Sequence, residues 1–258
     1  MRIMCNENEL QLNIQNHTEV EKKLFSEYAE YFCNSPISAV GKLQNFSKYI
    51  RRQDLSRFLA KHELFKMQLD IPGSIIECGC FQGGGTMTFA QLSSIYEPSN
   101  HTRKIITFDT FAGFPSVTAS DINSTRNYSA GDLSVYEGIE DELKKSIELF
   151  DKNRFLSHIP KVELIRGDAT ITIPQFLKDN PHLLISMIYF DFDIYEPTVI
   201  GLKTFIERMP KGAILAFDEL NAKVFPGETL ALLHTVGIKN LKLKKTFFDP
   251  YISYAIIE

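Results

Sequence analysis

The sequence lacks several features that mark specialised classes of protein. Four cysteines in 258 residues are too few for a disulfide framework. No apolar run reaches the ~18 to 20 residues of a membrane-spanning helix. The first residues contain no apolar segment of the kind found in signal peptides. These absences favour a cytoplasmic protein that is stabilised by a hydrophobic core.

Positive charge is also scarce. Lysine and arginine number 28 against 32 aspartates and glutamates, so the net charge is −4. A deficit of this kind argues against general affinity for nucleic acid or for an anionic membrane. There is no internal repeat or low-complexity tract, and 44% of the residues are hydrophobic. The chain is therefore expected to fold around one substantial hydrophobic core. Neither nucleic acid nor an anionic membrane is expected as its partner.

A helical first part is followed by a part in which strands and helices alternate. Apolar residues recur at helical spacing over 21–33, 38–49 and 54–69, and Asp54 is a suitable N-cap for the third stretch. Apolar strands are predicted at 74–78, 104–108, 162–165, 184–190 and 213–217, with helices at 86–95, 173–178 and 196–207. This alternation predicts an α/β fold with a doubly wound, Rossmann-like parallel sheet preceded by N-terminal helices.

The end of the chain breaks the alternation. Residues 241–248 and 251–257 are both strand-like, and strands joined so closely must pair antiparallel. A parallel sheet that ends in an antiparallel hairpin is not the usual layout of a dinucleotide-binding domain. We expect a helical cap or lid segment over 1–70, a ligand-binding domain over 71–258 and, inside it, a lid insertion over 116–161.

Every predicted parallel strand ends near an acidic residue. These residues are Glu77, Asp109, Asp168, Asp191 and Asp218. Aspartate is a good turn and cap residue, so each of them alone has a structural explanation. Ligands of doubly wound sheets bind outside the carboxyl ends of the strands. Five acidic residues at that edge therefore indicate a binding site.

The turn after the first strand is rich in glycine and reads ECGCFQGGGT from Glu77 to Thr86. Its spacing is not the G-x-G-x-x-G of dinucleotide sites, and no lysine follows as it would in a P-loop. A carboxylate two residues before the first glycine can take the ammonium of an amino-acid-like ligand, while helix N–H groups take its carboxylate. Cys78 and Cys80 read as small buried residues, because a C-x-C metal site needs two more soft ligands.

Five blocks carry a resemblance to a known family. They read PGSIIECGCFQGGGT, KIITFDTFAGFPS, VELIRGDA, IYFDFDIYEPT and AILAFDELN, followed by FPGET, and reach from about Phe58 to Glu228. The glycine loop is similar to the first motif of class I S-adenosylmethionine (AdoMet) methyltransferases, whose parallel sheet also ends in a reversed hairpin. More narrowly, the chain resembles the macrocin O-methyltransferase family (TylF, MycF and NovP type), which methylates sugar hydroxyls.

The resemblance implies how AdoMet is bound. The glycines Gly79, Gly83 and Gly84 would contact its methionine end, and Glu77 would order the loop or meet the amino group. Asp109 would accept the ribose hydroxyls, as an acidic residue does in Rossmann-like sites. A helix cap is the structural alternative for Asp109.

The third strand is followed by a further expected contact. Asp168 with Ala169 would face the adenine amino group. A turn formed by Gly167 and Asp168 is the structural alternative.

Four acidic residues are expected to converge beside this pocket. Asp191 and Asp193 follow the fourth strand, and Asp218 and Glu219 follow the fifth. Carboxylates so close repel one another unless a cation lies between them, and a set without His or Cys favours Mg²⁺, or Ca²⁺ or Mn²⁺ in its place. The resemblance implies Asp191, Asp218 and Glu219 as the ligands, with Asn221 as a substitute for Glu219.

The expected reaction is displacement at the methyl carbon of the sulfonium by a deprotonated hydroxyl. Asp191 is the first candidate for the base and Asp193 the second, since both can lie next to the metal. Capping of the helix at 196–207 is the alternative role of Asp193. None of the six histidines lies in a matched block; His158 can reach the site, but a surface role is favoured.

Together these features predict an AdoMet- and Mg²⁺-dependent O-methyltransferase that acts on a hydroxyl of a sugar or glycosylated small molecule. The alternatives are a same-fold enzyme of another class, hydroxylase-like or nicotinamide-dependent, and a non-catalytic partner module. We expect a cytoplasmic enzyme without a nucleic-acid or membrane partner. Its oligomeric state is left open, with a homo-oligomer among the alternatives.

Overall fold

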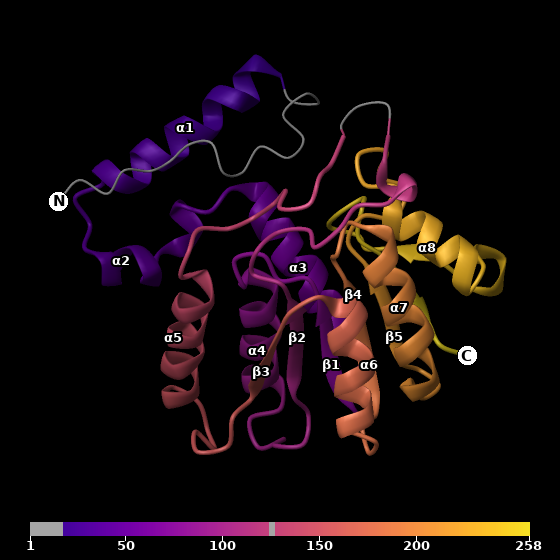
Figure 1. Ribbon diagram of the computed structural model, residues 1–258. Coiled ribbons are helices and arrows are strands. Elements are labelled where there is room, and N and C mark those ends of the chain that lie inside the picture. The colour runs from indigo at the N-terminus through magenta and orange to yellow at the C-terminus, as the bar shows by residue number, and fades with distance from the viewer. Residues whose placement is uncertain (1–17, 124–126) are drawn as a thin grey trace. The chain divides into compact units, whose positions relative to one another are not determined.

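The computed structural model describes residues 18–123 and 127–258, except for the side chain of Lys22 (Figure 1). Two units divide the chain, 1–57 and 58–258, and their boundary lies inside helix α3 (Arg52–Met67). The expected cap over 1–70 and lid over 116–161 include residues 1–17 and 124–126, which lie outside the described residues. The cap and lid roles stay predictions.

The first unit is helical. It contains α1 (Glu19–Asn34), α2 (Ala39–Gln44) and the 3₁₀ turn η2 (Phe46–Lys48), so the helix predicted over 38–49 is broken at Asn45. Thr18 and Glu21 form a capping box at the start of α1. The predicted N-cap role of Asp54 is wrong. Asp54 lies inside the first turn of α3, where its carboxylate accepts hydrogen bonds from Arg51 at 2.7 and 2.6 Å.

A seven-stranded sheet organises the second unit, in the order β3-β2-β1-β4-β5-β7-β6. Its strands are β1 (Ser74–Cys78), β2 (Ile105–Asp109), β3 (Val162–Arg166), β4 (Ile185–Phe190), β5 (Ile214–Phe217), β6 (Lys244–Lys245) and β7 (Ser253–Ile256). The first five are parallel, β7 pairs antiparallel with β5, and β6 pairs antiparallel with β7. The predicted α/β fold with a terminal hairpin is confirmed, although β6 is much shorter than expected.

Helices cover both faces of this sheet (Figure 1). Side chains alternate along a strand, so Ile76 and Cys78 pack on one face and Ile75 on the other. The first face is covered by α6 (Ala169–Asp179), α7 (Tyr195–Phe205) and α8 (Gly227–Thr235). The second is covered by the later part of α3, by α4 (Gly84–Tyr96) and by α5 (Ile139–Lys152).

Two helices were not predicted from the sequence. α5 lies in the insertion that was expected to be a lid, and its apolar face buries Ile139, Leu143 and Phe150. α8 begins inside the FPGET block. Short 3₁₀ turns add η3 (Ala119–Asp121), η4 (Ile206–Arg208) and η5 (Ile238–Asn240). The second half of the insertion is therefore part of the packed domain.

Arg103 holds the amino-terminal edge of the sheet together. Its side chain is buried and donates to the Glu97 carboxylate at 2.8 Å and to three backbone carbonyls, those of Gly73, Leu69 and Ile71. It also bonds the side chains of Gln68 and Ser186. A planar guanidinium carries five donors, and this site uses them to join the end of α3 to β1 and β4.

Candidate functional site

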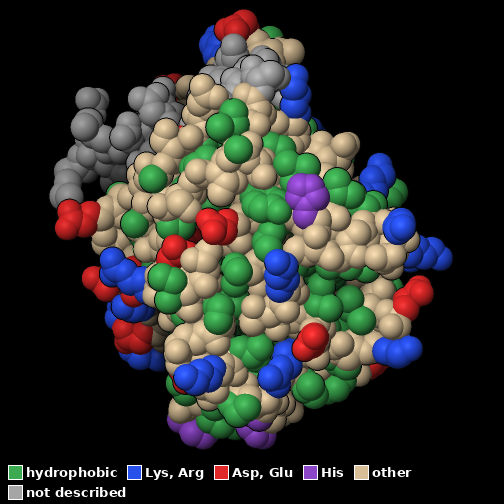
Figure 2. Space-filling model, turned by 45° about the vertical axis from the view of Figure 1, so that its right-hand side comes forward, with side chains coloured by type: hydrophobic (Ala, Val, Ile, Leu, Met, Phe, Trp, Pro, Cys, Tyr) green, Lys and Arg blue, Asp and Glu red, His purple; other side chains and the backbone are tan. Residues whose placement is uncertain are grey.

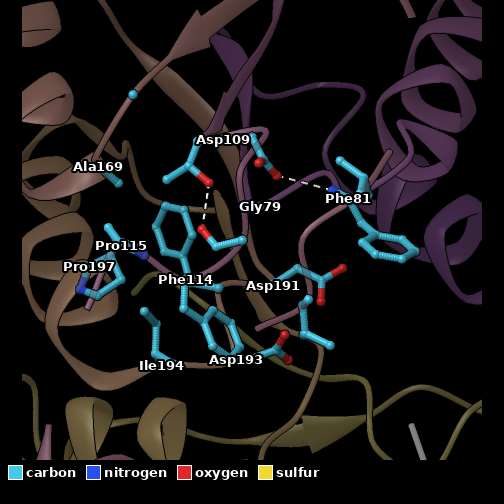
Figure 3. A pocket seen from close by; sticks show the side chains of 16 residues that line it. Gly79, Phe81, Asp109, Phe114, Pro115, Ala169, Asp191, Asp193, Ile194 and Pro197 are labelled. Carbon is cyan, nitrogen blue, oxygen red and sulfur yellow. Dashed lines mark hydrogen bonds between the residues drawn. The ribbon is translucent and has the colours of Figure 1, made fainter. Parts of the chain in front are cut away.

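A pocket opens at the carboxyl ends of the strands, and the empty space in it, including the part open to solvent, is about 600 Å³. Most of its wall is apolar, and three carboxylates, those of Asp109, Asp191 and Asp193, interrupt it. Figure 3 shows Asp191 and Asp193 together on one side, with Ala169 and Pro197 on the other. The lining consists of Gly79, Phe81, Asp109, Thr110, Gly113, Phe114, Pro115, Leu133, Val135, Gly167, Ala169, Asp191, Phe192, Asp193, Ile194 and Pro197.

The glycine loop is shaped by close backbone approach. Gly79 has φ +97°, and a Cβ at this position would lie 2.1 Å from the carbonyl oxygen of Asp191. No larger residue fits between β1 and the end of β4 without a shift of the backbone. Gly83 is the left-handed N-cap of α4, and Gly84 is its first residue. The N–H groups at the start of α4 have no intrahelical partner and suit an anionic ligand group.

Asp109 lies at the end of β2 and lines the pocket. Its carboxylate accepts backbone hydrogen bonds from Cys80 at 2.7 Å, Phe81 at 3.1 Å and Phe111 at 2.7 Å (the Phe81 bond is drawn in Figure 3). The carboxylate thus ties β2 to the glycine loop and caps no helix. The Cys80 side chain also hydrogen-bonds this carboxylate, so a ribose hydroxyl would share the acceptor positions with these donors.

Glu77 is buried below the loop rather than in the pocket wall. Its carboxylate accepts hydrogen bonds from the hydroxyls of Thr86 and, at 3.2 Å, Thr107. Burial raises its pKa to about 7, against the opposing effects of the Thr86 bond and the Lys61 ammonium. Of the two expected roles, this placement favours ordering of the loop.

Asp168 and its neighbours have separate roles. The Asp168 carboxylate caps α6 and accepts hydrogen bonds from the backbone N–H of Thr170 at 2.9 Å and from its hydroxyl at 2.8 Å. Gly167 and Ala169 line the pocket. The contact of Asp168 with adenine stays a prediction, and the structure shows its carboxylate engaged as a cap.

The acidic edge is built where β4 and β5 end. The N–H of Asp191 donates to the carbonyl of Cys78 and the N–H of Asp218 to that of Phe190, each at 2.8 Å, so both aspartates follow their strands directly. β4 does not continue through Asp193, which has φ +63°. Asp193 does not cap α7 either; the Asp121 carboxylate accepts a hydrogen bond from the N–H of Tyr195 at 2.6 Å.

The carboxylates at this edge act on one another. Burial, followed by the charges of Asp191 and Glu219, holds the pKa of Asp193 well above its ordinary value. Asp218 is 2% exposed and adds to the same effect. The four acidic residues that we expected to converge are thus close enough to affect one another's charge; they are Asp191, Asp193, Asp218 and Glu219.

Glu228 is a member of this cluster that the sequence analysis missed. It is fully buried in the first turn of α8, and its carboxylate accepts hydrogen bonds from the backbone N–H groups of Asp193 at 3.4 Å and Glu219 at 3.3 Å. Burial and the charges of Asp191 and Asp218 raise its pKa well above the usual range. The FPGET block had signalled this position, but no role was assigned to it.

The cluster suits a hard cation by its chemistry. All its donors are carboxylate oxygens, and their mutual repulsion falls when a cation binds. Among residues 18–123 and 127–258, no three acidic, histidine or cysteine side chains already meet around one metal position. Asn221 is exposed, and its N–H donates to the Thr229 hydroxyl at 2.9 Å. Binding of an ion here therefore requires carboxylates to reorient.

The insertion expected to be a lid contributes to the pocket wall, through residues that the sequence did not single out. Leu133 and Val135 line the pocket beside Phe114. The N–H of Phe114 donates to the carbonyl of Asp132, and the N–H of Gly131 donates to that of Phe114, each at 2.9 Å. The pattern FDTFAGFP had marked Phe114, whereas nothing marked Leu133 and Val135.

Other features of the described residues lie outside the pocket. His158 is exposed and precedes β3, so it lies away from the carboxyl edge. Figure 2 shows a face on which lysine and arginine are interspersed with acidic side chains. Among the helices of the described residues, none combines the length and the apolar character that crossing a bilayer requires. The absence of a nucleic-acid or membrane partner stays a prediction.

Comparison with known proteins identifies relatives. The family model of macrocin-O-methyltransferase (TylF) matches residues 50–228. A crystal structure of CalS11, a calicheamicin methyltransferase, superposes with a TM-score of 0.89 at 32% identity and covers 93% of both chains. Apo CalS11, named as TDP-rhamnose 3′-O-methyltransferase, gives 0.81 at 29% identity over 93% of this chain and 95% of that one. The O-methyltransferase NovP shares the fold, with a TM-score of 0.59 at 17% identity over 79% and 80%. No curated protein sequence matches the chain.

Proposed function

The chain belongs to the macrocin O-methyltransferase (TylF) family, and we propose that it methylates a hydroxyl of a sugar or glycosylated small molecule with the help of Mg²⁺. The predicted family, the fold and the enzyme class are confirmed: the protein is an AdoMet-dependent O-methyltransferase. The acceptor and the metal are the proposed parts. The observation that carries them is the acidic edge that borders the pocket.

The pocket suits AdoMet in the polarity of its wall. Apolar walls around Phe114, Pro197 and Ala169 can enclose an adenine ring, and Asp109 offers a carboxylate acceptor for ribose hydroxyls in the same pocket. The start of α4 offers N–H groups to a carboxylate. We assign the methionine end of AdoMet to the glycine loop and the ribose to Asp109.

A sugar hydroxyl is the proposed nucleophile. CalS11 is described as a TDP-rhamnose 3′-O-methyltransferase, and it covers nearly the whole of this chain. A sugar hydroxyl is a weak acid, so it must lose its proton as it attacks the methyl carbon. Mg²⁺, when bound to vicinal hydroxyls, lowers their pKa. Asp191, Asp218 and Glu219 are the proposed ligands, because they lie at one edge and present only oxygen donors.

The chain's own residues then have three tasks. The glycine loop and Asp109 place the sulfonium, and the acidic edge places the acceptor, so that the attacking oxygen lies in line with the methyl carbon. A carboxylate oxygen of Asp191 takes the hydroxyl proton, with Asp193 as the second candidate. Both line the pocket and lie beside the proposed acceptor position.

The test is methyl transfer from labelled AdoMet to TDP-rhamnose and to a simple glycoside with vicinal hydroxyls. We expect transfer to at least one of them, loss of transfer in excess EDTA, and recovery with added Mg²⁺. Full activity in EDTA would remove the metal from the mechanism. Binding of nicotinamide cofactors instead of AdoMet would support the oxidoreductase alternative. Binding of AdoMet without transfer to any hydroxyl acceptor would support the partner module.

A further inference from the structure

A buried lysine and a buried tyrosine connect the second face of the sheet to the acidic edge. Lys61, in α3, is 7% exposed, and its ammonium donates to the Tyr189 hydroxyl at 3.1 Å. It also lies 4.4 Å from the centre of the Tyr189 ring. The Tyr189 hydroxyl in turn donates to Oδ1 of Asp218. The Lys61 ammonium itself is 4.0 Å from that oxygen.

The sheet register brings these groups together. Tyr189 of β4 lies beside Glu77 of β1 and beside Ala216 of β5, and residues two apart on a strand share a face. Asp218 follows Ala216 by two residues, on the same face as Tyr189. α3 covers this face, so its lysine reaches the ring. Lys61 lies outside the quoted sequence blocks, and no role was assigned to Tyr189.

The hydrogen bonds among Lys61, Tyr189 and Asp218 can run in only one direction. A lysine ammonium has donors only, so its proton must point to an oxygen lone pair of Tyr189. The single proton of the tyrosine hydroxyl is then left for Asp218 Oδ1. A charged donor behind the hydroxyl also makes the hydroxyl a stronger donor. The Asp218 carboxylate is consequently held in one orientation from the side of the core.

We propose that Lys61 and Tyr189 are positioning residues that orient the Asp218 carboxylate for its cation. The inference rests on the proposed function, in which Asp218 is a metal ligand. Groups that orient a metal ligand typically change metal affinity ~10- to 100-fold when they are removed. A buried pair with a purely structural role would change stability without changing metal affinity.

The test uses Mn²⁺ as the probe, because its binding can be followed by calorimetry and by paramagnetic resonance without turnover. Tyr189→Phe keeps the ring and its contact with Lys61 but removes the hydroxyl. We expect Mn²⁺ to bind ~10- to 100-fold more weakly and AdoMet to bind within about twofold of the unmodified enzyme. Turnover should fall at low Mg²⁺ and recover at high Mg²⁺. Tyr254→Phe is the matched control: Tyr254 is buried on the same face and pairs with Ala216 from β7, on the side of β5 opposite Tyr189.

The variant Lys61→Met tests whether the lysine acts through the tyrosine. Loss of a nearby positive charge by itself should tighten cation binding, by the same factor in the unmodified enzyme and in the Tyr189→Phe variant. If Lys61 acts through the hydroxyl, its replacement costs affinity only when the hydroxyl is present, so the two substitutions are not additive. Additive effects would overturn the role of Lys61.

The outcomes separate this proposal from the proposed function. Mn²⁺ binding by Tyr189→Phe that equals that of the unmodified enzyme would overturn the proposal alone. If the unmodified enzyme binds neither Mn²⁺ nor Mg²⁺, the metal in the proposed function is wrong, and this proposal falls with it. Weaker Mn²⁺ binding with intact AdoMet binding, absent from Tyr254→Phe, supports the proposal.

Discussion

Buried charge is arranged in opposite ways at the amino-terminal and the carboxyl-terminal ends of the parallel strands. At the amino-terminal edge, Arg103 is a single buried cation whose donors reach a carboxylate, two side chains and three carbonyls. At the carboxyl edge, Asp193 and Glu228 share a small region with three further carboxylates, and burial, together with the neighbouring charges, raises their pKa values. One edge is electrostatically satisfied, and the other gains when a cation binds.

The difference separates residues that hold the fold from residues that serve the reaction. Loss of Arg103 leaves buried groups without partners, so it should cost stability. Loss of the Asp191 carboxylate from the acidic edge relieves repulsion, so it should cost activity and spare the fold. Each prediction below changes one side of this comparison.

The largest effect is expected for Asp191→Asn, because it removes a proposed ligand charge and the candidate base together. Methyl transfer should fall by ~10² to 10⁴. The free energy of unfolding measured without metal should stay the same or rise, since one of the repelling charges is gone. Labelled AdoMet and urea titration measure the two quantities. An inactive variant that is also much less stable would place Asp191 among the structural residues.

Arg103→Met should have the next largest effect, and on stability. Removing one partner of a buried ion pair costs about 3 to 5 kcal/mol, and here several carbonyls also lose their donor. Urea denaturation should show this loss, while the folded enzyme keeps its turnover number at low temperature. Lys104→Met is the control: it removes a neighbouring charge from a side chain that is mostly outside the core. A stable Arg103→Met variant would contradict the comparison.

Glu77 predicts how stability depends on pH. Its pKa rises from 4.5 to about 7 on folding, so between these values the folded state holds a proton that the unfolded state has lost. The contribution of Glu77 to stability is therefore greatest below pH 4.5 and declines up to pH 7, by about 3 kcal/mol in total. Glu77→Gln should remove this decline and be the more stable protein at a pH above this range. If the free energy of unfolding depends on pH equally in both proteins, ionisation of Glu77 does not destabilise the folded state.

The smallest effect concerns the backbone of the glycine loop. Gly79→Ala places a Cβ against the Asp191 carbonyl and should weaken AdoMet binding at least tenfold, or about 1.4 kcal/mol. Gly138→Ala is the matched control, because Gly138 has the same φ of +97° but no atom within 4 Å of a new Cβ. The Gly138→Ala variant should have the same strain from its positive φ, but it should bind AdoMet as tightly as the unmodified enzyme. Calorimetry that finds equal affinities for both variants would mean that the close approach is unimportant.

Much of the fold could be predicted because its strands are short, apolar and bounded. β1 was predicted at its observed limits, and the other parallel strands within one or two residues at either end. α5 was missed although Ile139, Leu143 and Phe150 recur at helical spacing, because the whole insertion that contains it was expected to be a lid. Asp54 was misassigned because a cap and a first-turn acidic residue look alike in the sequence.

The candidate site was predicted in part. The strand ends located Asp109 and Asp191 at the pocket, because the carboxyl ends of parallel strands meet at one edge. The burial of Glu77 depends on neighbours from other elements, whereas the cap formed by Asp168 is local, because its donors lie two residues away. Glu228 and Lys61 come from helices whose docking no local pattern reveals.

The sequence by itself determined the sheet, the glycine loop and the acidic residues at the strand ends. Each of these depends on residues that are close together in the chain. The tertiary structure decided which carboxylates face one another, which are engaged by backbone N–H groups and which are reached by a buried lysine. These relations join residues that are far apart in the chain, such as Lys61 with Tyr189 and Asp193 with Glu228. They depend on strand order and helix packing, which put distant parts of the chain within hydrogen-bond distance.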